Sequence, residues 1–233
     1  MRGRRALILV FGESEHDRRA LVELVRGLRP DLRDLVEERR RPLVLIKGTL
    51  PSKARSNAEE IAALARVEQR TRNVLAVLAH EDCDAIEPAH AEVAEKIEAE
   101  LRAAGCPGEP IGAAPAWETE TWWMVFPEAV GKIVEGWRDP DDWLGRDVGR
   151  VEWAKEKLAA AVQPRPRPRK GPPRPYEERD SISVARNIVQ DDLLRSFADG
   201  RRTTPARTGT ARVETRSASL ERFRTRVLAI RHG

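Results

Sequence analysis

The chain has 233 residues, 34% of them charged and 40% hydrophobic, and a formal net charge of +4 at pH 7. This length suits one principal domain with a small appendage, and no apolar run approaches the roughly 20 residues of a membrane span. The apolar run at 6–11 is too short for a signal-peptide core and the two cysteines form no zinc or redox motif, so we expect a cytoplasmic protein without a membrane partner.

Uncharged apolar runs alternate with helical patterns through the first 137 residues. The runs at 6–11 and 74–79 contain no charge and predict strands that are buried on both faces. The elements expected in chain order are a strand at 6–11, a helix at 13–28, a strand at 42–47, a helix capped by Ser56, a strand at 74–79, a helix at 88–104, an edge strand at 110–116 and a Trp-rich helix at 121–137. This alternation predicts an α/β fold with a mostly parallel sheet flanked by helices.

Prolines alternating with arginines interrupt every regular pattern at 163–175 and predict an extended linker. We therefore expect an α/β domain at 1–162 and a helical basic extension at 176–233. The extension is too small for a core of its own and is expected to pack on the sheet domain or on a partner. The elements expected after residue 137 are helices at 151–162, 183–197 and 220–230 and a loop at 200–213.

Charge is unevenly distributed along the chain. Residues 163–233 contain 17 Lys/Arg and 8 Asp/Glu, whereas residues 1–162 contain 25 and 30. A basic tail of this kind favours a polyanionic partner such as DNA or RNA, because neutralised phosphates release counterions. A tail that is merely solvated, or that faces an acidic protein surface, explains the same asymmetry.

Acidic residues follow three of the expected elements. Parallel strands end at one edge of a sheet, so these acids are expected to meet in a shared cleft. Carboxylates gathered in this way favour a divalent cation, Mg²⁺ or Mn²⁺, and the chemistry of phosphodiester cleavage. The candidate ligands are Glu13 and Glu15 after the first strand, Asp82 and Asp84 after the 74–79 strand, and Glu118 and Glu120 near the fourth. An alternative holds for Glu13, Asp17, Glu87 and Glu118, because acids in a helix's first turn also complement its dipole.

Three further groups allow two interpretations each. Lys47, Lys53 and Arg55 are expected either to contact a nucleic-acid backbone or to form a solvated basic loop. His80 is either a metal ligand or a hydrogen-bonded structural group. All six tryptophans fall between Trp117 and Trp153, which favours core packing over base stacking.

The order of these motifs resembles a known family. Gly-Glu-Ser-Glu at 12–15, His80-x-Asp82 with Asp84, Glu118-x-Glu120-x-Trp122 and Ser-Leu-Glu-Arg-Phe at 219–223 look like TOPRIM-related bacterial proteins found beside AAA or ABC-type ATPases. Their relatives include the nuclease half of the overcoming-lysogenization-defect proteins. The resemblance implies a TOPRIM-like domain in which Glu13, Asp82 and Asp84 are catalytic. The implied metal ligands are Glu13 or Glu15, Asp82, Asp84, and Glu118 or Glu120.

Two positions depart from the family pattern. Phe11 stands where the family has a glutamate before its glycine, and His80 stands at the first aspartate of the Asp-x-Asp pair. The leading hypothesis is a metal-dependent nuclease of a bacterial defence or DNA-maintenance system that acts with an ATPase. The alternative is a catalytically inactive subunit that binds or regulates that ATPase, and a third is a phosphohydrolase of small substrates. Self-association is left open.

Overall fold

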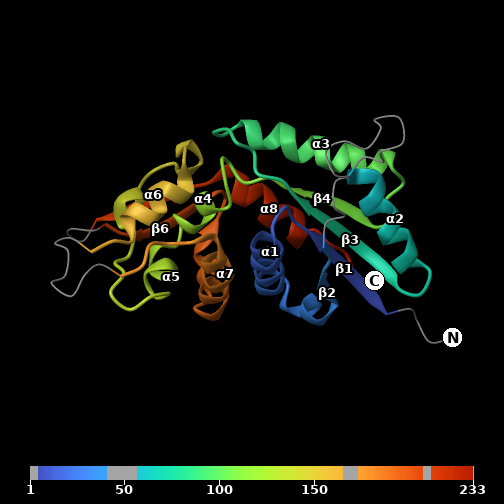
Figure 1. Cartoon of the computed structure of the whole chain (residues 1–233), viewed down its shortest axis with the longest axis horizontal. Helices are drawn as coiled ribbons and strands as arrows, with labels where there is room; N and C mark the ends of the chain where they lie inside the picture. The colour runs from blue at the N-terminus through green and yellow to red at the C-terminus, as the bar shows by residue number, and fades with distance from the viewer. Residues whose placement is uncertain (1–4, 41–56, 165–172, 207–210, 233) are drawn as a thin grey trace.

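The computed structural model describes residues 5–40, 57–164, 173–206 and 211–232 (Figure 1). Its centre is a sheet of four parallel strands in the order β2-β1-β3-β4. The strands are β1 (Ala6–Phe11), β2 (Val36–Glu38), β3 (Asn73–His80) and β4 (Glu109–Ala113). The predicted α/β class is therefore confirmed, and the arrangement is consistent with a Rossmann-like fold.

The uncharged runs form the inner strands, as their sequences predict. Every residue of β1 is buried, and β4 lies at the edge of the sheet, where Pro110 is tolerated. The short strand β2 was not predicted, because Val-Glu-Glu carries no apolar run. The strand expected at 42–47, together with Ser56, Lys47, Lys53 and Arg55, lies outside the described residues.

Helices cover both faces of the sheet. Alternate residues of β1 point to opposite faces: Ile8 and Val10 join one core, and Leu7, Leu9 and Phe11 join the other. The second core lies under α2 (Asn57–Gln69) and α3 (Ala89–Ala103). The first core contains residues of α1 (Glu15–Leu28), α7 (Ser181–Gln190) and α8 (Ala218–Leu228). The helices of the C-terminal segment thus pack against α1 and the sheet.

The Trp-rich segment differs from the single helix expected at 121–137. It forms two short helices, α4 (Glu120–Trp123) and α5 (Pro127–Gly131). Pro127 starts the second helix because it has no N–H to continue the first. The helix expected at 151–162 is α6 (Ala154–Ala161). Short 3₁₀ helices occur at Pro30–Leu35, Asp141–Trp143, Val148–Arg150, Glu178–Asp180 and Leu193–Ser196.

The prediction of a loop at 200–213 is wrong for most of that segment. Strands β5 (Phe197–Ala198), β6 (Arg201–Pro205) and β7 (Arg212–Arg216) form an antiparallel sheet of three strands. Their sequences are mostly Arg and Thr and show no apolar alternation. The segment is held instead by Arg202, which is buried over the Phe126 ring and paired with Glu128.

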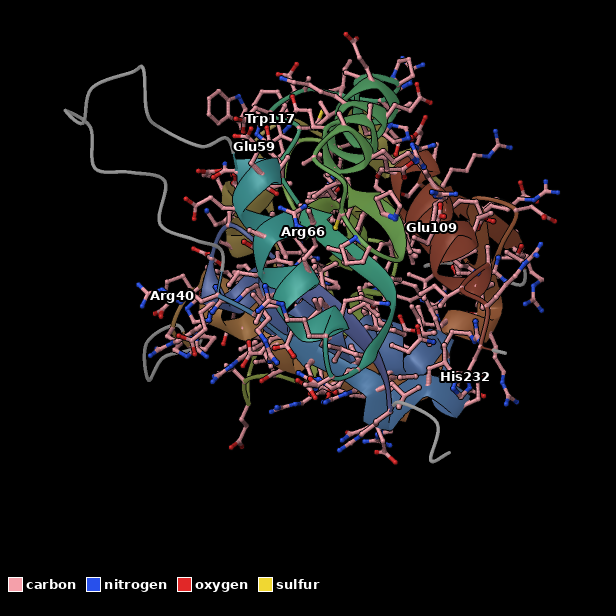
Figure 2. All side chains as sticks on the ribbon, turned by 90° about the vertical axis from the view of Figure 1, so that its right-hand side faces the viewer. Arg40, Glu59, Arg66, Glu109, Trp117 and His232 are labelled. Atoms are coloured by element: carbon pink, nitrogen blue, oxygen red, sulfur yellow. The ribbon has the colours of Figure 1, made fainter. Side chains whose placement is uncertain are left out.

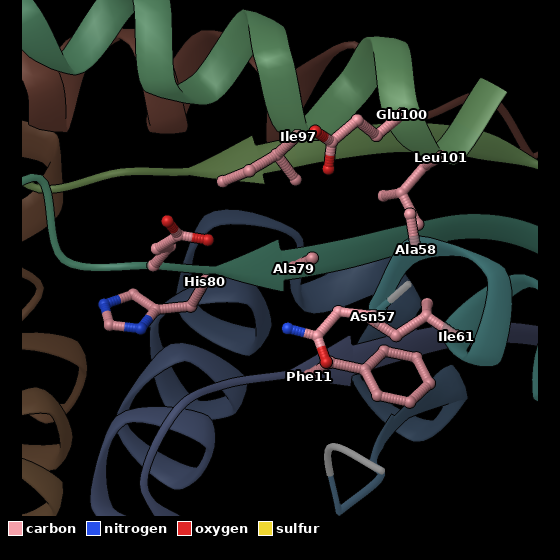
Figure 3. A pocket seen from close by; sticks show the side chains of 10 residues that line it. Phe11, Asn57, Ala58, Ile61, Ala79, His80, Ile97, Glu100 and Leu101 are labelled. Atoms are coloured by element: carbon pink, nitrogen blue, oxygen red, sulfur yellow. The ribbon is translucent and has the colours of Figure 1, made fainter. Parts of the chain in front are cut away.

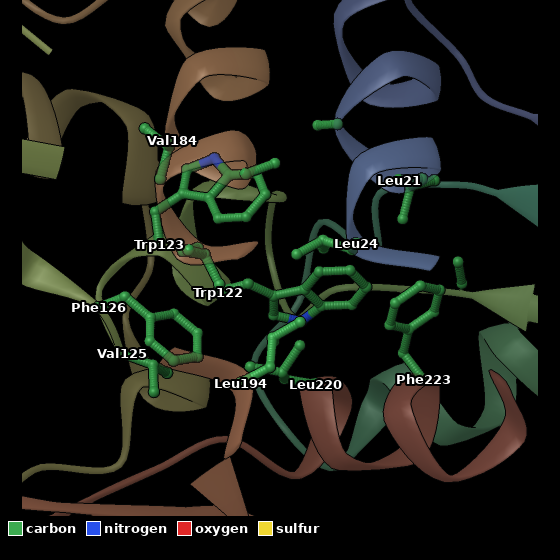
Figure 4. Close-up of a cluster of buried hydrophobic side chains, with 14 of the residues drawn as sticks. Leu21, Leu24, Trp122, Trp123, Val125, Phe126, Val184, Leu194, Leu220 and Phe223 are labelled. Carbon is green, nitrogen blue, oxygen red and sulfur yellow. The ribbon is translucent and has the colours of Figure 1, made fainter. Parts of the chain in front are cut away.

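Two adjacent tryptophans join the C-terminal helices to the rest of the molecule (Figure 4). Trp122 stacks on Phe223 of α8 at a centroid distance of 5.0 Å, and its Nε1 donates to Ser219 Oγ at 3.0 Å. Trp123 Nε1 donates to Ser181 Oγ of α7 at 3.2 Å. Core packing is therefore the role of these two rings.

Among the described residues no helix is long and apolar enough to cross a membrane.

Candidate functional site at the carboxyl edge of the sheet

The loops that follow β3 and β4 lie side by side at the carboxyl edge of the sheet. Asp84 N donates to Trp117 O at 3.1 Å, and Trp117 N donates to Ala85 O at 2.8 Å. Helix α1 begins at the same edge, after β1. The structure therefore brings the segments that carry the candidate acids to one edge. The chemistry available there depends on the contacts that their side chains make.

His80 is the centre of this edge. Its side chain is fully buried, and Nε2 lies 3.0 Å from Thr119 Oγ1 and 3.4 Å from Asp82 Oδ1. Thr119 Oγ1 donates its only proton to Asp17 Oδ1 at 3.3 Å. Nε2 must therefore carry the proton that it shares with Thr119. The imidazole links the end of β3 to the starts of α1 and α4.

Asp17 is held from the other side by the start of α1. Ser14 Oγ accepts from Asp17 N at 3.1 Å, and Ser14 N and Oγ donate to Asp17 Oδ2 at 3.2 and 2.8 Å. This capping box satisfies backbone donors that the helix would otherwise leave unpaired. The helix-start interpretation of Asp17 is thus confirmed, and its carboxylate additionally accepts from Thr119.

The charges of His80 and its neighbours stabilise one another. Burial would lower the pKa of His80, but its interaction with the accepting carboxylate of Asp82 and the charges of Asp17, Asp82 and Glu13 raise it above its ordinary value. Burial would raise the pKa of Asp17, but the His80 charge and the bonds from Ser14 and Thr119 lower it. The surrounding carboxylates therefore favour the charged form of His80, whose buried Nδ1 has no hydrogen-bond partner in the described part of the chain.

Glu118 and Glu120 are directed toward the C-terminal half. Glu118 Oε2 accepts from Lys155 N at 3.0 Å, at the first turn of α6, and burial raises the pKa of Glu118. Glu120 is 4% exposed, and Tyr176 Oη donates to its Oε1 at 3.0 Å. Burial raises the pKa of Glu120 to about 8. A carboxyl that keeps its proton at neutral pH is a poor ligand for a hard cation.

The other predicted ligands are more exposed. Glu13 is exposed and contributes charge to the His80 environment. Glu15 pairs with Arg19 at 2.8 Å on the surface of α1. Asp84 is exposed, with a positive φ of 49°. Phe11 is fully buried.

We tested whether these residues fit a divalent cation. Within residues 5–40, 57–164, 173–206 and 211–232, no three His, Cys, Asp or Glu side chains are arranged to hold a metal ion. Glu118 bonds α6, Glu120 bonds Tyr176, and Asp82 faces an imidazole where a metal would need to stand. The donor set does not fit Mg²⁺ or Mn²⁺ in this arrangement.

A small cavity lies beside this cluster (Figure 3). It lies where β1 and β3 end, between α2 and α3, and its lining includes Phe11, His80, Ile61, Leu101 and Glu100. Parallel sheets commonly bind ligands where the strand order reverses, and β1 and β3 flank that point here. The cavity has a volume of about 30 Å³, which is enough for one water molecule and too small for an organic substrate.

Sequence reasoning missed the roles of Ser14, Thr119 and Tyr176. Ser14 and Asp17 carry a recognisable signal, since Ser-x-x-Asp before an apolar helix predicts reciprocal capping. Thr119 and Tyr176 have no local signal, because their partners are 102 and 56 residues away along the chain.

Comparison of the chain with protein-family models, curated proteins and solved structures gives no match.

Proposed function

We propose that the chain is a non-catalytic binding subunit that uses its α/β body to hold a partner protein. One observation carries this proposal: a buried imidazole, His80, lies among Asp17, Asp82 and Glu13, where a metal-dependent enzyme would place its cation. An imidazolium there offsets part of the negative charge of the carboxylates and lies where a cation would otherwise bind. The acids can therefore coexist without metal.

The resemblance to TOPRIM-related proteins supports the same proposal. At both positions where this chain departs from that family, the side chain is fully buried: Phe11 has no polar atom, and His80 is bonded to Thr119. The partner implied by the resemblance is an AAA or ABC-type ATPase in a bacterial defence or DNA-maintenance system of the cytoplasm. The chain would bind or regulate that ATPase.

Calorimetry with Mn²⁺ tests this proposal. We expect no saturable heat when Mn²⁺ is added to the full chain at millimolar concentration, and no nicking of plasmid DNA in the same buffer. Asp82→Asn should behave like the unaltered protein. The matched control is Asp31→Asn, a carboxylate paired with Arg29 on the surface. Stoichiometric Mn²⁺ binding that Asp82→Asn abolishes and Asp31→Asn retains would contradict a non-catalytic role.

A second candidate function is a Mg²⁺- or Mn²⁺-dependent nuclease acting on DNA or RNA. One observation favours it: Asp82 Oδ1 is buried without a hydrogen-bond partner of normal geometry in the described structure, and Asp84 follows two residues later. If His80 lost its proton, this oxygen would lose its only charged neighbour named above, and the Asp-x-Asp pair would then be available to a metal. Mn²⁺-dependent plasmid nicking by the unaltered chain, lost in Asp82→Asn, would establish this function in place of the first.

A further inference from the structure

The exposed Trp153 and the half-buried Trp117 form an aromatic pair at the carboxyl edge. Trp153, just before α6, is 58% exposed, and its ring lies 5.0 Å from that of Trp117 with an interplanar angle of 60°. Trp117 lies at the periphery of the molecule in Figure 2. The other exposed large apolar side chains of the described residues, Leu64, Val67 and Leu228, lie on α2 and α8.

The backbone holds this pair in an unfavourable conformation. Trp117 has a φ of 58° and Trp153 a φ of 54°, a region that bulky side chains rarely adopt. Asp84, whose φ is 49°, donates its N–H to the carbonyl of Trp117. Burial does not account for Trp153, since most of its ring is in solvent. An indole held outward in this way is available for binding.

Carboxylates surround the pair. Asp84 is exposed beside Trp117, and the half-buried Glu118 follows Trp117 in the chain. Glu152 and Glu156 are exposed on either side of Trp153. Arg150, Lys155 and Lys157 are cations near Trp153 in the chain, and the charge of Lys155 is partly engaged by Glu118 at 3.9 Å. A phosphate backbone would meet repulsion here, whereas a cationic group would be attracted.

The chain shows elsewhere which group fits an aromatic ring with a carboxylate. Arg174 Cζ lies 5.4 Å from the Trp137 ring centroid, and its guanidinium donates to Asp180 at 2.7 and 2.6 Å. Arg202 is held in the same way, by Phe126 and a glutamate. Among the described residues, no guanidinium lies over the Trp117–Trp153 pair.

We propose that this surface, formed by Trp117, Trp153, Asp84 and Glu118, binds an arginine-rich segment of a partner protein. A guanidinium stacks on an indole face while its N–H groups donate to a carboxylate, which matches both features of the surface. The inference rests on the proposed function, because it names the surface through which a binding subunit would hold its partner.

A peptide of nine arginines is the probe, titrated into the full chain while tryptophan fluorescence and heat are recorded. Trp153→Gly is the main variant, because glycine adopts a positive φ without strain and should preserve the fold. We expect it to weaken binding by about tenfold, the loss of one desolvated cation–π contact. Asp84→Asn removes one exposed carboxylate and should weaken binding less than Trp153→Gly does. Asparagine also tolerates a positive φ, so this variant should keep the fold. The matched control is Leu64→Ala, an exposed apolar residue on α2, which should leave the affinity unchanged.

Four results would overturn the inference. The first two are that the unaltered chain does not bind the peptide, and that Trp153→Gly binds it with equal affinity. The third is that the chain binds oligo(dT) in preference to the peptide and needs Trp153 to do so. The fourth is that the unaltered chain self-associates in a dilution series and Trp153→Gly does not. The last two would assign the surface to a nucleic acid or to a second copy. Mn²⁺ calorimetry separates this inference from the proposed function. If Trp153→Gly loses peptide binding while the unaltered chain binds Mn²⁺ stoichiometrically, the docking surface is supported and the non-catalytic role is rejected.

Discussion

Asp17 and Glu120 are both buried carboxyl groups, and their environments have opposite effects. Asp17 faces His80 through Thr119, and its pKa is lowered despite burial. Glu120 faces the hydroxyl of Tyr176, and burial raises its pKa to about 8. Burial alone therefore does not set the charge of an acid. The neighbours matter as well: the charge of His80 and the hydrogen bonds from Ser14 and Thr119 keep Asp17 ionised, whereas the hydrogen bond from Tyr176 does not outweigh the burial that leaves Glu120 mostly protonated at neutral pH.

This difference bears on function. Asp17 lies in a cluster where the charge of His80 favours its ionised form, whereas burial favours the neutral form of Glu120. Neither presents carboxylates that require a metal. A cluster of acids in a sequence is thus an incomplete argument for a metal site until the cations and donors around it are known.

The largest expected effect comes from removing the cation. In His80→Ala, Asp17 and Asp82 would keep their charges without their shared partner, and we expect the free energy of unfolding to fall by about 3 kcal/mol. The control is His90→Ala, because His90 is also buried but its pKa is lowered, chiefly by burial, so its neutral form is favoured. Urea unfolding at pH 6.5 measures both. A smaller loss for His80→Ala than for His90→Ala would show that His80 is not the cation of the cluster.

The second effect is a pH dependence that originates at Glu120. Because its pKa is raised from 4.5 to about 8, the folded state binds more protons than the unfolded state between these values. Stability should therefore fall as pH rises through this window, by at most about 1.4 kcal/mol per pH unit from this group. The raised pKa of His80 adds a loss in the same direction only above about pH 6.5.

Glu120→Gln isolates that contribution. The variant keeps a group that can accept from Tyr176 but cannot ionise, so its stability should vary less between pH 4.5 and 6.5 than that of the unaltered chain. Urea midpoints across this range provide the measurement. Parallel curves for the two proteins would mean that Glu120 ionises as readily in the folded state as in the unfolded one.

Much of the sheet could be predicted from the sequence, because buried parallel strands require uncharged apolar runs. The runs at 6–11 and 74–79 became β1 and β3. The position of α1 followed from its apolar spacing, and that of α3 from Pro88 at its start and Gly105 after its end. Strands β6 and β7 could not be predicted in this way. Their stability comes from tertiary contacts, such as Arg202 with Glu128, that leave no periodic pattern.

The site was less predictable than the fold. Strand ends indicated the correct edge, since His80 and Asp82 lie there, but the sequence does not show which way a side chain points. Glu118 and Glu120 are two residues apart, yet one bonds the backbone of α6 and the other bonds Tyr176. The partners come from distant segments, and only the packed structure brings them together.

The charge of His80 tests the central claim most directly. We would record the ring ¹⁵N and ¹³C resonances of His80 by NMR at pH 6.5, before and after addition of Mn²⁺. The account predicts a mainly protonated imidazolium whose signals keep their position and width when Mn²⁺ is added. A neutral ring whose signals are broadened by stoichiometric Mn²⁺ would contradict it.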